Sequence, residues 1–117
     1  GVDRICLFGA GDYGKRMLNE LQLRGFLVHS YIDNDEKKWN TRICGIPCYG
    51  MDYLVKHQEH TAVIVSALAE DEIKLQLEKS NIKYIKKYSE IYKKLFYCEP
   101  LKSVLKENLK HEHEVEA

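Results

Sequence analysis

Three glycines near the start of the chain are spaced for holding phosphate. Gly9, Gly11 and Gly14 form the pattern Gly-x-Gly-x-x-Gly directly after a predicted strand, Arg4 to Phe8, which contains the apolar run Ile5 to Phe8. In that pattern the first glycine permits a tight turn, the second lets a pyrophosphate approach the backbone, and the third lets a helix pack closely on a strand. The start of the helix then offers unpaired N–H groups and the positive end of a dipole to an anion. The predicted phosphate site comprises Gly9, Ala10, Gly11, Asp12, Tyr13 and Gly14.

An acidic residue follows the glycine pattern at the distance typical of a ribose contact. Asp33 lies about 20 residues beyond the turn, at the end of a second apolar run, Phe26 to Ile32. A carboxylate at this place accepts hydrogen bonds from ribose hydroxyls, and it disfavours a ligand with a ribose 2′-phosphate. Asp33 and its neighbour Asn34 are therefore part of the predicted binding site.

The same glycines fit a second phosphate-binding pattern less well. Gly9, Gly14 and Lys15 match Gly-x-x-x-x-Gly-Lys, but Arg16 stands where a Ser or Thr would bind magnesium. The sequence therefore disfavours an ATPase or GTPase. Lys15 and Arg16 either contact phosphate or form a solvated first turn of the helix, and the sequence leaves both alternatives open.

The chain lacks the residue patterns of the common catalytic and metal sites. A sugar epimerase or short-chain dehydrogenase needs Tyr-x-x-x-Lys, because the cation lowers the pKa of the phenol for proton transfer, and no tyrosine of this chain has that lysine. The catalytic residues therefore remain unknown. No metal site is predicted, because no Cys or carboxylate pair accompanies the histidine pairs His57 and His60, and His111 and His113. We expect reduced, structural thiols at Cys6, Cys44, Cys48 and Cys98.

Composition limits the classes of protein that the chain can represent. It has 117 residues, 44% of them hydrophobic, which suffices for one core but not for a cofactor domain and a full catalytic domain. The formal net charge of +0 favours neither nucleic acid nor an anionic membrane as a partner. No apolar run is long enough to span a bilayer and no signal-peptide pattern opens the chain, so we expect a cytoplasmic domain.

Apolar runs alternate with segments of helical periodicity, which is typical of a parallel sheet built from βαβ units. The pattern predicts a Rossmann-like α/β fold, with a sheet of about five parallel strands flanked by helices. The predicted strands are 4–8, 26–32, 61–66 and 82–85, with short extended pieces in 43–50. The predicted helices are 13–24, 51–59 and 70–80. Leu23 belongs to the predicted apolar side of the first helix, and Gly25 ends that helix.

The chain becomes helical again from Tyr88. We predict a Rossmann-like core over residues 1–87 and, in the same domain, C-terminal helices separated near Pro100 and a polar tail over 88–117. The apolar face that includes Leu95, Leu101 and Leu105 packs on the sheet, forms a homodimer or binds a partner enzyme.

Three motifs in order resemble a known group of domains: Phe8 to Lys15, Tyr31-Ile32-Asp33-Asn34-Asp35, and Gly45 to Gly50. The region 4–85 resembles the small Rossmann-like nucleotide-binding domains of bacterial surface-polysaccharide enzymes. These are N-terminal regions of nucleotide-sugar dehydratases, sugar-phosphate transferases and sugar acetyltransferases. The resemblance implies that the three glycines face phosphate, that Asp33 reaches a ribose or sugar hydroxyl, and that Ser66 and Ala67 line the site. It implies NAD or a nucleotide-sugar as the ligand.

Three functions remain open at this point. The first is a nucleotide- or nucleotide-sugar-binding domain that serves as an auxiliary or excised part of a glycan-biosynthesis enzyme. It explains why the phosphate pattern occurs without catalytic residues, so we expect no catalysis by the chain alone. The second is a fragment of an NAD-dependent sugar oxidoreductase. The third is a regulatory module in which nucleotide binding alters the pairing of the C-terminal helices.

Overall fold

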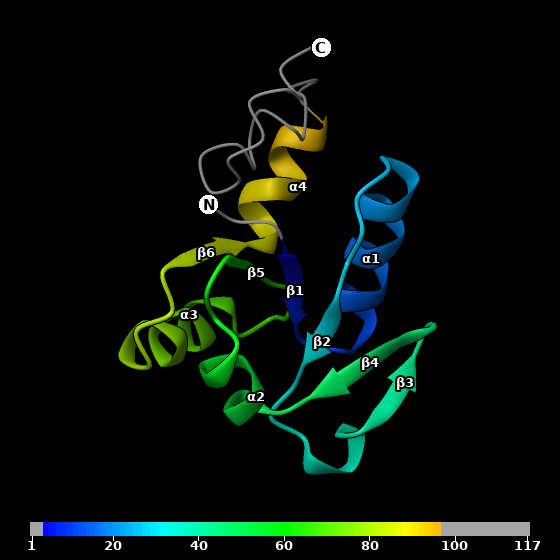
Figure 1. Cartoon of the computed structure of the whole chain (residues 1–117). Coiled ribbons are helices and arrows are strands. Elements are labelled where there is room, and N and C mark those ends of the chain that lie inside the picture. Colours follow the sequence, from blue (N-terminus) through cyan, green and yellow to red (C-terminus); the bar gives the residue numbers. More distant parts are fainter. Residues whose placement is uncertain (1–3, 97–117) are drawn as a thin grey trace.

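The structure, a computed structural model, describes residues 4–96, which form six strands, four helices and a short 3₁₀ turn (Figure 1). The strands are β1 (Arg4–Phe8), β2 (Ser30–Ile32), β3 (Thr41–Ile43), β4 (Ile46–Tyr49), β5 (Thr61–Val65) and β6 (Tyr84–Lys87). The helices are α1 (Asp12–Leu23), α2 (Met51–Lys56), α3 (Glu70–Lys79) and α4 (Tyr88–Phe96), and the 3₁₀ turn is Glu36–Lys38. No helix in this part of the chain is both long and apolar enough to cross a membrane.

The strands form one sheet in the order β3-β4-β2-β1-β5-β6. All neighbours are parallel except β3, which runs antiparallel to β4. Phe8 is in register with both Ile32 and Val65, so the three central strands end together. From β1 the chain builds outward in one direction through β2 and then in the other through β5. At such a reversal, the turns that follow the two central strands at their carboxyl ends diverge to opposite sides of the sheet.

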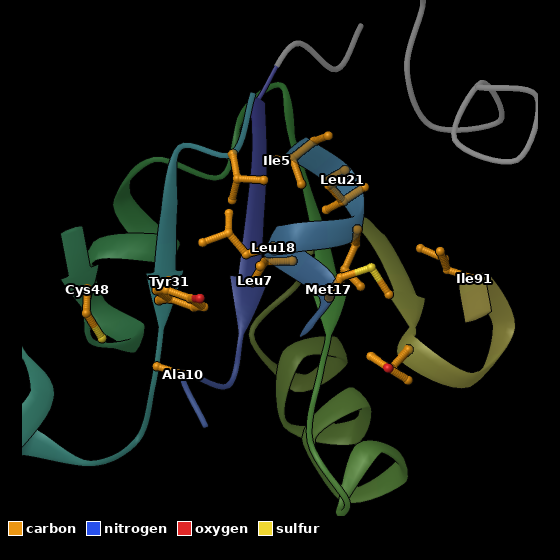
Figure 2. Close-up of a cluster of buried hydrophobic side chains, with 13 residues drawn as sticks. Ile5, Leu7, Ala10, Met17, Leu18, Leu21, Tyr31, Cys48 and Ile91 are labelled. Atoms are coloured by element: carbon orange, nitrogen blue, oxygen red, sulfur yellow. The ribbon is translucent and has the colours of Figure 1, made fainter. Parts of the chain in front are cut away.

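Helices cover both faces of the sheet, and each face has its own core cluster. Met17 of α1 and Ile91 of α4 pack on one face (Figure 2), and Leu54 of α2 and Leu77 of α3 pack on the other. Successive residues of β1 alternate between the two clusters and are all buried or nearly so, which is why this strand reads as a continuous apolar run. The Rossmann-like α/β prediction is confirmed, with six strands instead of about five and one of them antiparallel.

Two predicted strands begin later than expected, and helix capping explains both differences. The second strand was expected from Phe26 but begins at Ser30. The N–H of Phe26 donates to the carbonyl oxygen of Leu21 (3.0 Å) and that of Gly25, at φ +83°, to Gln22 (3.0 Å). These are the two bonds of a Schellman cap, so the residues after the helix complete its end before any strand can start.

The same cap ends α3 and delays the last strand. The N–H of Ile82 donates to Leu77 (3.1 Å) and that of Asn81, at φ +62°, to Glu78 (3.0 Å). Ile82 therefore belongs to the cap, and the strand expected over 82–85 is Tyr84–Lys87. The placement of Leu23 on the apolar side of α1 is also wrong, because this side chain is 72% exposed.

The glycine- and proline-containing stretch 43–50 folds into a hairpin. Ile43 pairs with Ile46 across Cys44 and Gly45, which have φ values of +53° and +86°. Two consecutive positive φ values are typical of the tightest hairpin turns, in which the second residue is usually glycine. The hairpin brings β4 beside β2, and so places Gly50 at the same edge of the sheet as the glycine turn.

Candidate functional site

Two of the three glycines in the turn are required by the protein's own packing. Gly9 has φ +112°, and a Cβ there would lie 2.5 Å from the carbonyl oxygen of Ser66. A Cβ on Gly14 would overlap the carbonyl of Gly9 and lie 3.2 Å from the ring of Tyr31. These glycines allow the turn after β1 to pass close to the end of β5, and α1 to pack close to the sheet.

Gly11 differs from the other two glycines, because nothing inside the described structure requires it. Its φ of −96° and ψ of −153° are extended backbone, and a Cβ would meet no atom within 4 Å. A methyl group or larger side chain there would project into open space at the start of α1. Open space at this position leaves room for a ligand to approach the backbone.

The first turn of α1 carries amide groups without protein acceptors. Gly11 is the N-cap residue, and no side chain caps the helix. After the N–H of Ala10, the next N–H along the chain that has an acceptor is that of Lys15. It donates to the carbonyl oxygen of Gly11 (3.0 Å). Within residues 4–96, the N–H groups of Gly11, Asp12, Tyr13 and Gly14 have no hydrogen-bond acceptor. Four such donors at the positive end of a helix dipole have the chemistry needed to bind an anion.

Asp33 lies beside the glycine turn and is itself held in place. Its Oδ2 accepts a hydrogen bond from the N–H of Ala10 (2.9 Å), and its Oδ1 accepts one from the N–H of Asp35 (2.8 Å). The Nζ of Lys38 lies 3.7 Å from Oδ2. Because a carboxylate has about four acceptor positions, each oxygen keeps capacity for another donor such as a ribose hydroxyl. The sequence did not predict the bond to Ala10, which gives Asp33 a structural role as well.

Of the remaining predicted site residues, some lie beside the glycine turn and others contact different parts of the protein. The carbonyl oxygen of Ser66 and the Cβ of Ala67 lie next to Gly9, so both residues border the turn. The side chain of Asn34 points instead to α3, where it exchanges two hydrogen bonds with Gln76 (both 3.1 Å). The ring of Tyr13 packs edge-on against Tyr88 of α4, with ring centroids 5.2 Å apart.

Sequence analysis missed Trp39, the only tryptophan of the chain. Its indole Nε1–H donates to the carbonyl oxygen of Asp33 (2.7 Å). Its ring covers Gly50, where a Cβ would lie 2.7 Å from the nearest ring atom. The sequence signal that could have revealed this contact is a large aromatic residue in the polar segment after Asp33, together with a glycine at the end of the following strand.

The described histidines and cysteines do not gather into a reactive centre. Residues 4–96 contain no cluster of three metal-ligating side chains, and His111, His113 and Cys98 lie outside the described residues. Cys6, Cys44 and Cys48 are free thiols. Burial raises the pKa of Cys6, and it raises the pKa of Cys48 to about 11, so neither forms the thiolate that nucleophilic chemistry needs.

Comparisons with known proteins agree with this fold. Residues 1–96 match the family model described as C2185-like, N-terminal, and the chain belongs to that family. No curated protein matches it in sequence. Among solved structures, UDP-D-quinovosamine 4-dehydrogenase from Vibrio fischeri is similar over 73% of this chain and 76% of its own, with 21% identity and a TM-score of 0.58.

A second similar structure is RSP, a Rex-family repressor. The likeness covers 91% of this chain and 63% of the repressor chain, with 13% identity and a TM-score of 0.56. The same repressor has been solved with β-NADH, and with β-NAD⁺ and operator DNA. At sequence identities this low, the structural similarity establishes the shared Rossmann-like fold alone. This chain spans less than two thirds of the repressor's length.

Proposed function

We propose that this domain binds a dinucleotide of the NAD type at the carboxyl edge of its sheet. The pyrophosphate lies against the free N–H groups of Gly11 to Gly14, and the adenosine ribose donates hydroxyl hydrogen bonds to Asp33. One observation carries the proposal: the start of α1 has unpaired amides and open space at Gly11, next to a carboxylate held by Ala10. Ser66 and Ala67 lie beside Gly9 of the same turn, at the end of β5.

We further propose that the domain serves a larger enzyme of bacterial surface-glycan synthesis. The three motifs that resemble polysaccharide-enzyme domains support this assignment, as does the fold shared with a UDP-sugar dehydrogenase. The bound nucleotide would be either the cofactor of an NAD-dependent sugar oxidoreductase or a nucleotide-sugar presented to a transferase. In this proposal the residues around the glycine turn hold phosphate and ribose, and the chemical step belongs to another part of the protein or to a partner.

Binding measurements distinguish these ligands. Isothermal titration of the full chain with NAD⁺, NADH, NADP⁺ and UDP-glucose is expected to show NAD⁺ or NADH as the tightest ligand, with NADP⁺ weaker because its 2′-phosphate meets Asp33. Tighter binding of UDP-glucose would assign the site to nucleotide-sugars. Absence of binding by all four would contradict the proposal.

A glycine substitution connects the binding to the proposed site. Gly11→Val is expected to reduce affinity at least about tenfold, because its side chain fills the space of the phosphate. Gly11→Ala is the graded control, with a smaller loss. The free energy of unfolding of both variants is expected to stay within about 1 kcal/mol of the wild-type value, since a Cβ there meets no protein atom. Unchanged affinity in folded Gly11→Val would place the ligand elsewhere.

A contact between the turn and α4 favours a second candidate function, a nucleotide sensor. Tyr13 supplies one of the free amides and packs its ring on Tyr88, which stacks on Tyr92. Glu70 also accepts hydrogen bonds from the N–H (3.3 Å) and hydroxyl (2.8 Å) of Ser89 at the start of α4. Ligand binding at the turn would then alter how residues 88–117, which we assign to the same domain, pack or pair.

Sedimentation separates the sensor from a simple binding module. For a sensor, the mass of the sedimenting species or the dimerisation constant is expected to change when NADH is added. An unchanged mass with saturating NADH would remove this second function. The formal net charge of +0 gives no support to DNA binding by this chain, although the similar repressor was solved with operator DNA.

A further inference from the structure

The peptide groups of Asp33 are fixed from two sides by groups of the neighbouring strand and loop. Its N–H donates to the carbonyl oxygen of Tyr49 at the end of β4 (3.0 Å), and its carbonyl oxygen accepts from Nε1 of Trp39 (2.7 Å). The first bond continues the sheet. The second is made by a side chain six residues further along, so it restrains the segment between them.

The position of the Trp39 ring depends on Gly50. A Cβ on Gly50 would lie 2.7, 2.8 and 3.1 Å from three atoms of the indole, so the ring rests on the bare backbone at the end of β4. Gly50 has a φ of −92°, which other residues adopt readily. Its lack of a side chain therefore serves the contact with Trp39.

The carboxylate of Asp33 needs this restraint in order to bind a ribose. A hydrogen bond loses strength steeply as its angle departs from linearity, so a ribose is bound well only if the carboxylate keeps a fixed direction. The carboxylate also accepts from Ala10 and Asp35, and both bonds depend on where the Asp33 backbone lies.

We propose that Trp39 is a positioning residue for ribose recognition, which it sets through its hydrogen bond to Asp33 and its packing on Gly50. The inference rests on the proposed nucleotide function. It adds that recognition of the ribose hydroxyls depends on an indole N–H that does not itself contact the ligand. Trp39 is 36% exposed, and its one polar side-chain atom already donates to the backbone of Asp33.

The test compares two ligands and two variants of the full chain. ADP carries the ribose hydroxyls and 2′,3′-dideoxy-ADP lacks them, while both carry the pyrophosphate. Trp39→Phe keeps an aromatic ring over Gly50 but removes the N–H. Gly50→Ala keeps the N–H but pushes the ring away from its place. Affinities come from isothermal titration, and circular dichroism checks that each variant is folded.

The expected result is a selective loss. Trp39→Phe is expected to weaken ADP about threefold to tenfold, the equivalent of one hydrogen bond, and 2′,3′-dideoxy-ADP less than about twofold. Gly50→Ala is expected to produce the same selective loss, with ADP weakened and 2′,3′-dideoxy-ADP nearly unaffected, so one folded variant is sufficient for the test. An equal loss for both ligands would show a merely structural role for Trp39 and overturn the inference, as would unchanged affinities.

The wild-type protein separates failure of this inference from failure of the proposed function. Failure of wild type to bind either diphosphate would refute the nucleotide site itself, and the inference with it. Binding of both with equal affinity would keep the phosphate site but show that Asp33 does not recognise the ribose, which also overturns the role of Trp39.

Discussion

The Oδ2 of Asp33 accepts a hydrogen bond from the N–H of Ala10 at 2.9 Å, which joins the end of β2 to the turn after β1. The amides of residues 11–14, which follow Ala10, have no acceptor among the described residues, and the bond to Ala10 holds a carboxylate beside them. The proposed site therefore places positive donors for phosphate and a negative acceptor for ribose next to each other. Their arrangement forms part of the fold and does not depend on a ligand.

The three glycines of the turn are expected to differ in what they do. Gly9→Ala is expected to lower the free energy of unfolding by at least about 2 kcal/mol, because φ +112° and the contact with Ser66 both oppose a side chain. Gly11→Ala is expected to change it by less than about 1 kcal/mol. Urea unfolding monitored by circular dichroism measures both. Equal losses would contradict the separate roles assigned to the two glycines.

The bond between Asp33 and Ala10 predicts a stability role for a residue of the binding site. Asp33→Asn is expected to lower the free energy of unfolding by about 1–3 kcal/mol, because it removes the charge and leaves one acceptor oxygen for two N–H groups, those of Ala10 and Asp35. Asp35→Asn is the matched control, since its carboxylate accepts from Lys37 at an exposed position. If both substitutions cost the same in chemical denaturation, the bond to Ala10 has no special importance.

Asp12 is an exposed acidic residue in the first turn of α1, among the amides to which we assign the phosphate. Its negative charge stabilises the helix by interacting with the positive end of the helix dipole, but it repels an anionic ligand. Asp12→Asn is therefore expected to tighten NAD⁺ binding about twofold to fivefold at low salt, with a smaller gain at high salt. Asp52→Asn, in the first turn of α2, is expected to leave the affinity unchanged. A gain that is the same in both variants would argue against phosphate at α1.

The buried hydroxyl of Tyr31 makes no hydrogen bond of good geometry among the described residues, although the thiol of Cys44 lies close enough to interact with it. Burial of this side chain raises its pKa, so the phenol stays protonated. Tyr31→Phe removes an unsatisfied polar group and keeps the ring against Gly14, so we expect unfolding stability to stay constant or to rise by about 1 kcal/mol. A thermal-denaturation midpoint several degrees below wild type would reveal a partner for this hydroxyl.

The order of elements could be predicted from the sequence because apolar runs and helical periodicity follow local rules. The limits of β2 and β6 could not, because the caps at Gly25 and Asn81 use residues that are apolar enough to resemble strand. Likewise, β4 became recognisable only through its pairing with β2, a contact between distant segments.

The site was partly accessible from the sequence for the same reason. The glycine pattern and Asp33 are local signals, and the structure brings both to one edge of the sheet. The bond of Asn34 to Gln76 and that of Trp39 to Asp33 depend on tertiary folding, so spacing alone could not reveal them.

Backbone amide NMR tests the central claim most directly. In a ¹H–¹⁵N titration of the full chain with NAD⁺, the account predicts large, saturable downfield shifts for the amides of Gly11, Asp12, Tyr13 and Gly14, because each gains a charged acceptor. The amide of Ala10, already bonded to Asp33, is expected to move less. Saturable shifts that leave these four amides unchanged, or no shifts at all, would contradict the account.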